Sequence, residues 1–307
     1  MLLSNEINRI TETVGSSGAD IIIGFGGGKT IDVARAVADK AKLPVAVFPT
    51  TVSADAPTAR VSVIYTDDGV FDSCIFYNRN PELVAIDTRV IAHAPVRMLR
   101  SGLGDALATA VEARAVARAK KLRMDNTSRP TMAGLALAEK CEAILFNYAH
   151  QALRDNEEGI VSEALENICE ANTLLSGLGF EKGGLAAAHA IHNGFTAIHG
   201  DIHKMTHGEK VAFAVGVQLM MEGAPREEAD RYFEFMQSVG LPTTLEEIHL
   251  ADVSDEDLLK IATLACSEGE TLQQMPGSYE PVEVVEAIKA ADRYARSFRE
   301  RREHSAK

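Results

Sequence analysis

The 307-residue sequence predicts an α/β region followed by an all-helical region. Two observations predict this arrangement. Short β-branched runs alternate with a helical pattern up to about residue 90, which is typical of βαβ units and a parallel sheet. After Pro95, helical periodicity continues and no convincing strand pattern occurs. At roughly 100–200 residues per domain, the length also indicates two domains. We therefore expect an α/β domain over residues 1–94 and an all-helical domain over 95–307.

The beginning of the chain contains one complete βαβ unit. Residues 19–25 form a short apolar run that ends in glycines, typical of a strand buried on both faces. Residues 30–42 carry apolar side chains at helical spacing, and Pro44 then stops the helix. Residues 45–48 are the next expected strand. This order predicts two parallel strands joined by a helix.

Further strands and then helices follow. Residues 61–65 and 74–77 flank Thr66-Asp67-Asp68-Gly69, and Asp-Gly between two such runs predicts a hairpin. Residues 83–87 are the last expected strand. The expected helices of the second region are 96–118, 130–155, 160–176, 183–198, 208–222, 225–238, 254–267 and 281–303.

Composition excludes several function classes. The 31 basic residues against 44 acidic ones give a formal net charge of −13. This balance argues against a nucleic-acid binder and against a polybasic membrane-surface protein. No stretch approaches the ~20 apolar residues of a membrane span, and the first residues lack the features of a signal peptide. The four cysteines are far apart without a CxxC pair, so we expect reduced thiols in a cytoplasmic protein.

A glycine-rich turn, Gly24-Phe25-Gly26-Gly27-Gly28-Lys29-Thr30, joins the first strand to the first helix. Glycines allow a ligand to approach the backbone, and a helix N-terminus offers unpaired N–H groups to an anion. The turn matches neither the Walker pattern nor GxGxxG. It therefore predicts a phosphate contact, with a tight turn that binds no ligand as the alternative.

A polar loop follows the second strand. Residues 50–58 carry several hydroxyl groups and one acid, Asp55. In parallel sheets, ligands bind beyond the carboxyl ends of the strands, where this loop is expected. The loop thus predicts contacts to a polar ligand. The alternative is a turn whose Ser, Thr and Asp side chains bond only to backbone.

Histidines cluster in the second region. Five of the nine fall within 19 residues: His189, His192, His199, His203 and His207. His189 lies in a helix of small residues, and His207 begins another helix, so the two imidazoles can converge on one cation. A catalytic zinc takes three protein ligands and keeps one open position. Random clustering of surface histidines is the alternative, which fits His199 and His203 best.

Asp105 is a candidate third ligand. It lies among Gly, Ala and Leu in Gly102-Leu103-Gly104-Asp105-Ala106-Leu107, where a buried carboxylate needs a compensating cation or hydrogen bonds. A helix-capping role is the alternative.

In this order, these segments resemble the glycerol dehydrogenases of the iron-containing alcohol dehydrogenase superfamily. The matching pieces are GGGKTID at 26–32, SADAPT at 53–58, GDALAT at 104–109, ANTLLSGLGFEKGGLAAAHAIHNG at 171–194 and HGEKVAF at 207–213. The similarity runs nearly end to end, and its histidine-bearing stretch is the most specific part. It implies a Rossmann-like NAD-binding domain and an all-helical metal-binding domain, in a dehydroquinate synthase-like architecture.

The resemblance also implies a reaction and a set of site residues. The expected reaction is NAD-linked oxidation of glycerol, or of a similar small diol, to the ketone dihydroxyacetone or its analogue. It depends on one divalent ion per subunit, usually zinc, although a His₂Asp site also suits Fe or Mn. Asp105, His189 and His207 match the metal ligands, and Asp55 matches the glycerol-binding acid. The matches to NAD-contacting positions are Gly28, Lys29, Thr50, Ser53 and Tyr65. No residue is identified as the proton-relay base, for which His192 is a weak candidate. A homo-oligomer is expected.

Members of this family carry further β–α units before the segment that begins here at Leu2. At about 30 residues per βαβ-type unit, roughly 60 residues are expected to be absent, which makes the α/β domain truncated and exposes apolar strand edges. An inactive fragment of such an enzyme is therefore one alternative. A sister enzyme that acts on a phosphorylated polyol, such as dehydroquinate synthase or glycerol-1-phosphate dehydrogenase, is another.

Overall fold

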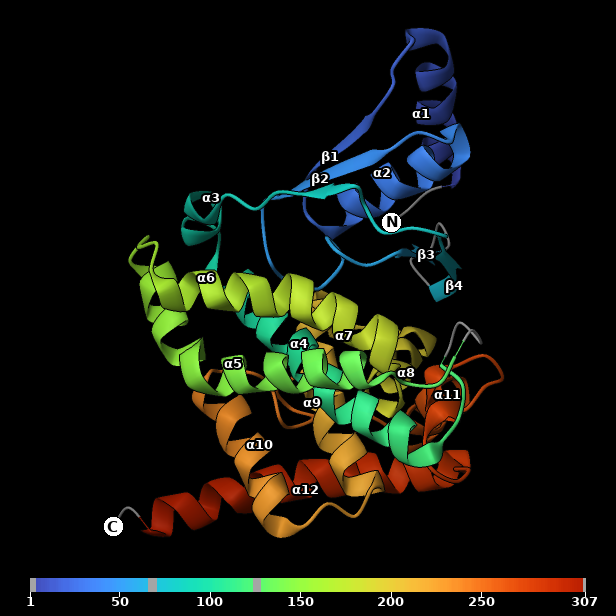
Figure 1. Cartoon of the computed structure of the whole chain (residues 1–307). Coiled ribbons are helices and arrows are strands. Elements are labelled where there is room, and N and C mark those ends of the chain that lie inside the picture. The colour runs from blue at the N-terminus through green and yellow to red at the C-terminus, as the bar shows by residue number, and fades with distance from the viewer. Residues whose placement is uncertain (1–3, 66–70, 124–127, 306–307) are drawn as a thin grey trace.

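The computed structural model describes residues 4–65, 71–123 and 128–305. An α/β region lies above a larger helical region in Figure 1, and the long helix α12 runs across the end farthest from the sheet. In chain order the α/β region contains α1 (Ser4–Ser17), β1 (Ile22–Gly26), α2 (Gly28–Ala41), β2 (Val45–Pro49), β3 (Val61–Tyr65), β4 (Phe71–Phe76), β5 (Leu83–Val84) and α3 (Thr88–Ala92).

Three of these strands form a parallel sheet in the order β1-β2-β5. Ile22 lies beside Val45, and Val47 lies beside Val84. Helix α2 packs against β1 and β2, and α1 packs against α2. The predicted βαβ unit and parallel sheet are confirmed.

The predicted hairpin strands are also present. β3 and β4 pair antiparallel, with Val63 beside Cys74. The turn expected at residues 66–69 lies outside the described residues. Helix α1 was not predicted, because its sequence is mostly polar. It is held by tertiary packing, in which Ile7 is buried in the same cluster as residues of α2.

The prediction that the first strand is buried on both faces is wrong. Ile22 and Gly24 point inward, but the side chains of Ile23 and Phe25 are 60% and 67% exposed. Helix α2 covers one face of β1, and within the described residues the other face is open. An apolar run of this length therefore indicates a strand, but it does not reveal how many of its faces are covered.

The helical region contains α4 (Val96–Ala119), α5 (Met132–Glu157), α6 (Glu163–Glu170), α7 (Ser176–Gly183), α8 (Ala187–Gly194), α9 (His207–Met221), α10 (Arg226–Ser238), α11 (Asp255–Ala265) and α12 (Pro281–Ser305). Short 3₁₀ turns occur at Phe195–Ala197, Asp201–Lys204 and Thr271–Gln274. Beyond Pro95, the described residues contain no strand, as predicted. The main hydrophobic core lies among these helices, with α4 and α9 contributing fully buried side chains such as Leu103, Leu107 and Val211.

One expected helix differs in detail. The helix predicted over 160–176 is instead α6, a π-helical turn at Ala171–Leu175, and α7. A π-turn inserts one extra residue into a helix and shifts the direction of the side chains that follow. Local periodicity does not reveal such an insertion, so the sequence pattern placed the helix end too early.

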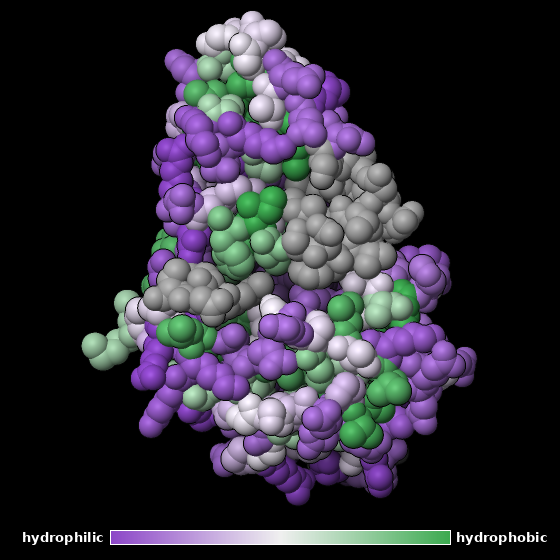
Figure 2. Space-filling view, turned by 90° about the vertical axis from the view of Figure 1, so that its right-hand side faces the viewer, coloured by the Kyte–Doolittle hydropathy of each residue, from purple (hydrophilic) through white to green (hydrophobic). Residues whose placement is uncertain are grey.

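The surface is mainly hydrophilic, as the composition predicts. On the face shown in Figure 2, hydrophilic residues surround separate hydrophobic patches. Among the described residues, no helix combines the length and the apolar character needed to cross a membrane. All four cysteines are free thiols, as expected.

Candidate metal and dinucleotide site

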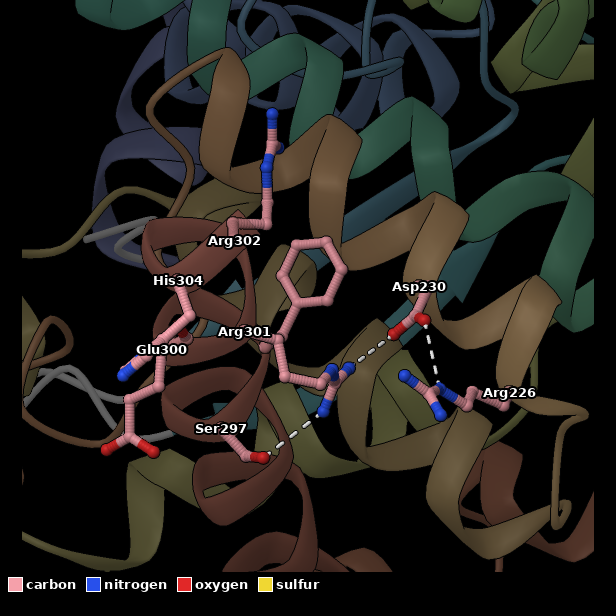
Figure 3. A pocket seen from close by; sticks show the side chains of 8 residues that line it. Arg226, Asp230, Ser297, Glu300, Arg301, Arg302 and His304 are labelled. Atoms are coloured by element: carbon pink, nitrogen blue, oxygen red, sulfur yellow. Dashed lines mark hydrogen bonds and ion pairs between the residues drawn. The ribbon is translucent and has the colours of Figure 1, made fainter. Parts of the chain in front are cut away.

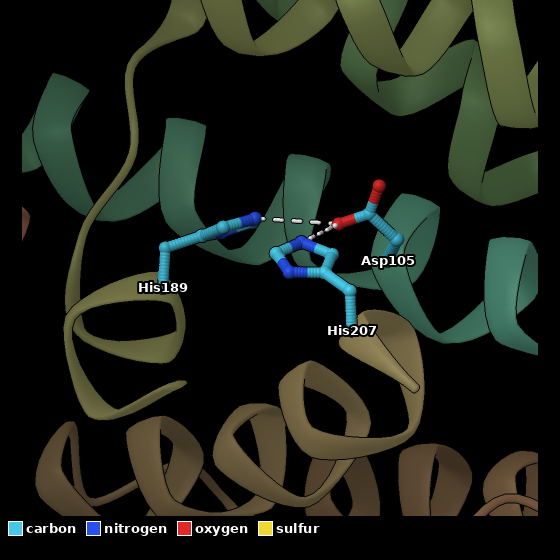
Figure 4. A group of neighbouring side chains, drawn as sticks. All are labelled: Asp105, His189 and His207. Carbon is cyan, nitrogen blue, oxygen red and sulfur yellow. Dashed lines mark hydrogen bonds and ion pairs between the residues drawn. The ribbon is translucent and has the colours of Figure 1, made fainter. Parts of the chain in front are cut away.

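Three side chains from three helices of the helical region converge. Figure 4 shows Asp105 from α4, His189 from α8 and His207 from α9 pointing toward one another. Asp105 Oδ1 lies 3.3 Å from His189 Nε2 and 3.0 Å from His207 Nε2. The three donor atoms lie within 4.8 Å of one another. The structure thus brings together the three residues that the sequence predicted as metal ligands.

Two glycines allow this convergence. A Cβ atom at Gly104 would lie 2.2 Å from the carbonyl oxygen of Gly208, and one at Gly208 would lie 1.7 Å from that of Ser101. Neither separation is possible for a real side chain, so only glycine permits this approach of α4 to α9. Because Gly104 precedes Asp105 and Gly208 follows His207, the close contact sets the distance between two of the candidate ligands.

The N-terminus of α9 is fixed by a capping box. Thr206 accepts from the backbone N–H of Glu209, and the Glu209 side chain accepts from the N–H of Thr206. Glu209 also forms a bidentate ion pair with Arg97 of α4, with both N···O distances at 2.8 Å. These bonds hold the first turn of α9, and therefore His207, against α4.

The start of α8 is held by a buried acid. Glu112 of α4 accepts hydrogen bonds from the backbone N–H groups of Ala186 and His189, at 2.8 and 3.0 Å. Its other oxygen lies 2.6 Å from His189 Nδ1. Glu112 therefore fixes both the backbone and the ring of His189.

The electrostatics of the cluster favour a cation. Burial disfavours ionisation of Asp105, but the two imidazoles outweigh it and hold the pKa of Asp105 well below its usual range. Burial also disfavours a charged His189 ring, yet Glu112 and Asp105 hold the pKa of His189 well above its usual value. The cluster therefore concentrates negative charge on buried carboxylates around two imidazoles.

The donor atoms fit a small divalent ion. With bonds of about 2.0–2.2 Å, the donor atoms of a tetrahedral zinc site are about 3.4 Å apart. The two separations between histidine Nε2 and Asp105 Oδ1, 3.3 and 3.0 Å, are close to this value. One carboxylate and two imidazoles are also ligands that such ions use.

Asp55 connects this cluster to the α/β region. Its backbone N–H donates to Asp105 Oδ2 at 3.1 Å, and its carboxylate accepts from the Ser176 hydroxyl at 2.9 Å. Ser176 lies 2.9 Å from Thr109 Oγ1, which extends the chain of hydroxyl groups into α4. Burial and then the charge of Asp105 raise the pKa of Asp55 well above its usual value.

The glycine-rich turn lies at the carboxyl end of β1, as predicted. Gly26 has φ +154°, and a Cβ there would lie 2.9 Å from Thr30 Oγ1, so the turn requires glycine. Helix α2 begins at Gly28, and its N-cap residue, Gly27, makes no side-chain capping bond. Its first N–H groups therefore have no side-chain cap of their own, an arrangement that suits an anion.

The other predicted cofactor residues lie on the neighbouring elements. The backbone N–H of Thr50 donates to the carbonyl of Gly26, which joins the turn to the loop after β2. Ser53 lies in that loop, and its carbonyl accepts from Ser101 of α4. Lys29 is exposed in the first turn of α2. Tyr65 ends β3, and its side chain lies outside what the structure describes.

The remaining clustered histidines divide into two groups. His192 is buried, and its Nε2 lies 3.1 Å from His207 Nδ1. His199 and His203 are exposed and lie outside the three-residue cluster. Burial and the neighbouring His207 lower the pKa of His192 well below its usual value. His192 is therefore part of the site's surroundings, whereas the other two are surface residues.

Several contacts around the cluster were not predicted. Glu112 bonds to His189, Ser176 bonds to Asp55, and Thr109 bonds to Ser176, yet none of the three was singled out from the sequence. A signal existed for Glu112, because it lies seven residues after Asp105 on the same helical face and among the same small apolar residues. Ser176 offered no such signal, because its position depends on the π-helical turn.

A separate surface hollow of about 760 Å³ lies between α10 and α12. Figure 3 shows Asp230 between Arg226 and Arg301, and Arg301 also donates to Ser297. The Arg301–Asp230 distance is 2.7 Å, and Arg302 pairs with Glu234 at 3.1 Å. Because these charges compensate one another, we assign no function to this hollow.

Comparisons with known proteins show which family the chain resembles. The family model described as "Iron-containing alcohol dehydrogenase" matches residues 3–88. The chain is 49% identical over 292 residues to the glycerol dehydrogenase of Thermotoga maritima, covering 95% of this chain and 79% of that protein. It is 47% identical to glycerol dehydrogenase 1 of Schizosaccharomyces pombe, covering 91% of this chain. The aligned part spans 62% of the length of the S. pombe protein.

A solved structure of glycerol dehydrogenase from Schizosaccharomyces pombe superimposes with a TM-score of 0.95 at 44% identity. That comparison covers 98% of this chain and 76% of the other. A sulfoacetaldehyde reductase from Bifidobacterium kashiwanohense, solved in complex with NAD⁺, shares the fold with a TM-score of 0.74 at 18% identity. With its fold, its three converging candidate ligands and these similarities together, the chain belongs to the iron-containing alcohol dehydrogenase family.

Proposed function

We propose that this chain catalyses the NAD-linked oxidation of glycerol to dihydroxyacetone with one Zn²⁺ ion at Asp105, His189 and His207. The convergence of these three side chains is the observation that carries the proposal. Identities of 44–49% to several glycerol dehydrogenases support glycerol as the substrate. When bound, the divalent ion supplies Lewis acidity toward a substrate hydroxyl, and the nicotinamide supplies the hydride acceptor.

The residues of the chain then bind and orient the reactants. Asp55 binds a glycerol hydroxyl next to the cation site, and Ser176 holds one of its carboxyl oxygens in place. Because the Asp55 backbone N–H donates to Asp105, the substrate-binding acid and the metal ligand keep a fixed relation to each other. Asp55 thus fixes the orientation of the polyol, including the carbon that loses hydride to the nicotinamide.

The turn at Gly28 and Lys29 binds the pyrophosphate of NAD. The uncapped N-terminus of α2 supplies N–H groups, and the exposed Lys29 supplies positive charge. Thr50, Ser53 and Tyr65 make further NAD contacts from the adjoining loop and strand. The hydrogen bond from Thr50 to Gly26 keeps the loop and the turn side by side.

The test is NADH formation by the 307-residue chain with glycerol, after chelation and readdition of Zn²⁺, Fe²⁺ or Mn²⁺. We expect activity that disappears on chelation and returns best with Zn²⁺. Restoration mainly by Fe²⁺ would overturn zinc as the metal. Metal binding without NADH formation from any polyol would identify an inactive chain.

A parallel panel tests the substrate. Glycerol and 1,2-propanediol should react, whereas glycerol 1-phosphate should not, because the neutral polyol is bound by an acid, Asp55. Faster oxidation of the phosphorylated polyol would favour the sister enzyme instead. Cytoplasmic location, a homo-oligomeric state and the division into domains at residues 94 and 95 stay predictions.

A further inference from the structure

Glu112 is a buried acid that the proposed chemistry does not use. Its side chain is fully inaccessible, and a carboxylate in such a place requires compensation. Its hydrogen-bond donors are the backbone N–H groups of Ala186 and His189 and the ring of His189. All three donors belong to the segment that carries one candidate metal ligand. The hydrogen bonds of the Glu112 carboxylate are therefore all made with the segment of His189.

This contact determines which ring nitrogen of His189 carries the proton. A carboxylate oxygen accepts hydrogen bonds, so at 2.6 Å from Glu112 the Nδ1 atom of His189 must donate. In the neutral ring, Nε2 then keeps a free lone pair. Nε2 is the atom that faces Asp105 Oδ1. The tautomer that suits Glu112 is therefore the one that binds a cation.

A different set of residues determines which ring nitrogen of His207 carries the proton. Asn193 Nδ2 donates to Glu270 at 3.1 Å, which turns the amide oxygen of Asn193 toward His192. His192 Nδ1 donates to that oxygen, so His192 Nε2 accepts from His207 Nδ1 at 3.1 Å. His207 Nε2 is again left to face Asp105.

We propose that Glu112 directly, and Glu270 through Asn193 and His192, are positioning residues that keep the proton on Nδ1 of both ligand histidines. Both Nε2 atoms are then directed at the cation. This inference rests on the proposed metal site and deepens it. The two supports differ, because His189 bonds to an acid and His207 bonds to a neutral ring. Loss of Glu112 should therefore weaken the site more than loss of His192.

Glu112→Gln is the sharpest test. Glutamine keeps the size of the side chain and, through its oxygen, the two bonds from backbone N–H groups. Its amide NH₂ replaces the oxygen that faces His189 Nδ1, so it favours the tautomer that cannot bind metal through Nε2. We expect the dissociation constant for Co²⁺, titrated into the metal-free full-length chain, to rise roughly 10- to 100-fold. An unchanged constant would overturn the inference.

Three further variants separate positioning from folding. Glu142→Gln alters another buried acid, which bonds to Tyr232 and Arg114 and to none of the site residues, and should leave Co²⁺ affinity unchanged. His192→Leu removes the acceptor of His207 and should weaken Co²⁺ binding by less than Glu112→Gln does. His192→Gln restores an acceptor and should recover part of that affinity. Equal losses in all four variants would mean a purely structural effect and would overturn the inference.

The wild-type protein distinguishes failure of the inference from failure of the metal site. If it does not bind one Co²⁺ ion per chain, the proposed site itself falls. If Glu112→Gln does not fold, ¹⁵N NMR of the Zn²⁺-loaded wild type decides instead. We expect a slowly exchanging, strongly downfield proton on Nδ1 of His189. A deprotonated Nδ1 at that residue would overturn the inference.

Discussion

The helical region and the α/β region differ in how completely they cover their own apolar surface. In the helical region, large side chains such as Leu107 and Phe213 are almost completely buried. On β1, Ile23 and Phe25 are mostly exposed. The candidate metal ligands lie in the well-packed region, where helices hold them at fixed distances. The candidate dinucleotide contacts lie on a turn and a loop beside the open sheet.

The candidate metal ligands and the candidate dinucleotide contacts are therefore held in place by different kinds of interaction. Close helix packing at Gly104 and Gly208 determines where the candidate metal ligands meet. Backbone conformation at Gly26 and the uncapped start of α2 determine the shape of the proposed anion site. Substitutions in one half should therefore leave the other half largely intact.

Asp105→Asn should have the largest effect. It removes the only carboxylate among the three converging donors while keeping the side-chain size. Because Lewis-acid stabilisation is worth several kcal/mol, we expect glycerol oxidation to fall by roughly 10³-fold or more. Steady-state NADH formation measures this loss. The affinity for NAD, measured by fluorescence titration, should stay within about twofold. A parallel loss of NAD binding would contradict the separation of the two halves.

Gly208→Ala should have the next largest effect. The new Cβ would clash with the Ser101 carbonyl and force α9 away from α4. We expect a loss of about 3 kcal/mol in the free energy of unfolding, together with weaker metal binding. Denaturant titration and Co²⁺ titration measure the two effects. Gly15→Ala is the matched control, because Gly15 lies in α1 and a Cβ there meets nothing within 4 Å. It should be neutral or slightly stabilising.

The pH dependence of stability should reveal a partly buried acid of the α/β region, Asp32. Burial raises the pKa of Asp32 to about 6, although Arg35 and Ser62 act to lower it. The folded state then holds a proton that the unfolded chain releases above about pH 4, so stability falls as pH rises from about 4 to about 6. The expected contribution is about 2 kcal/mol. Denaturant titrations across this range should show a shallower slope for Asp32→Asn than for the unchanged protein. The exposed Asp39→Asn should keep it, and equal slopes in all three proteins would contradict the assignment.

Gly26→Ala tests the dinucleotide half. Its positive φ and the short distance to Thr30 leave no room for a Cβ atom. The displaced turn should weaken NAD binding about tenfold, or about 1.4 kcal/mol, with unchanged Co²⁺ affinity. Gly18→Ala shares the positive φ at a turn before β1, so it controls for backbone strain alone. If Gly18→Ala weakened NAD binding equally, general destabilisation would explain the effect.

The sequence predicted more of the helical region than of the α/β region. The limits of α4, α9 and α12 agree with the expected helices to within about two residues, because long segments with a regular apolar face reveal their own period. Helix α1 and the open face of β1 were not predicted correctly. Both depend on which neighbouring elements are present, and local periodicity carries no information about neighbours.

The candidate site was also predicted only in part. Asp105, His189 and His207 stood out because a buried acid and clustered histidines are unusual among small apolar residues. The residues that support these three side chains did not stand out in the sequence. Glu112 is 77 positions from His189, and Ser176 is 121 positions from Asp55. Such pairs form only once the helices have packed, so composition and spacing did not connect them.

Phe25→Ser should have the smallest effect on stability. Phe25 is two-thirds exposed on β1, so its removal loses little buried apolar area and should change the free energy of unfolding by no more than about 0.5 kcal/mol. Phe213→Ser, at a residue buried in α9, is the matched comparison and should cost about 3–5 kcal/mol. Phe25→Ser should also reduce self-association in light scattering, because it removes apolar surface at an open strand. A loss above about 1 kcal/mol would mean that this face of β1 is packed in solution, and the contrast between the two regions would then disappear.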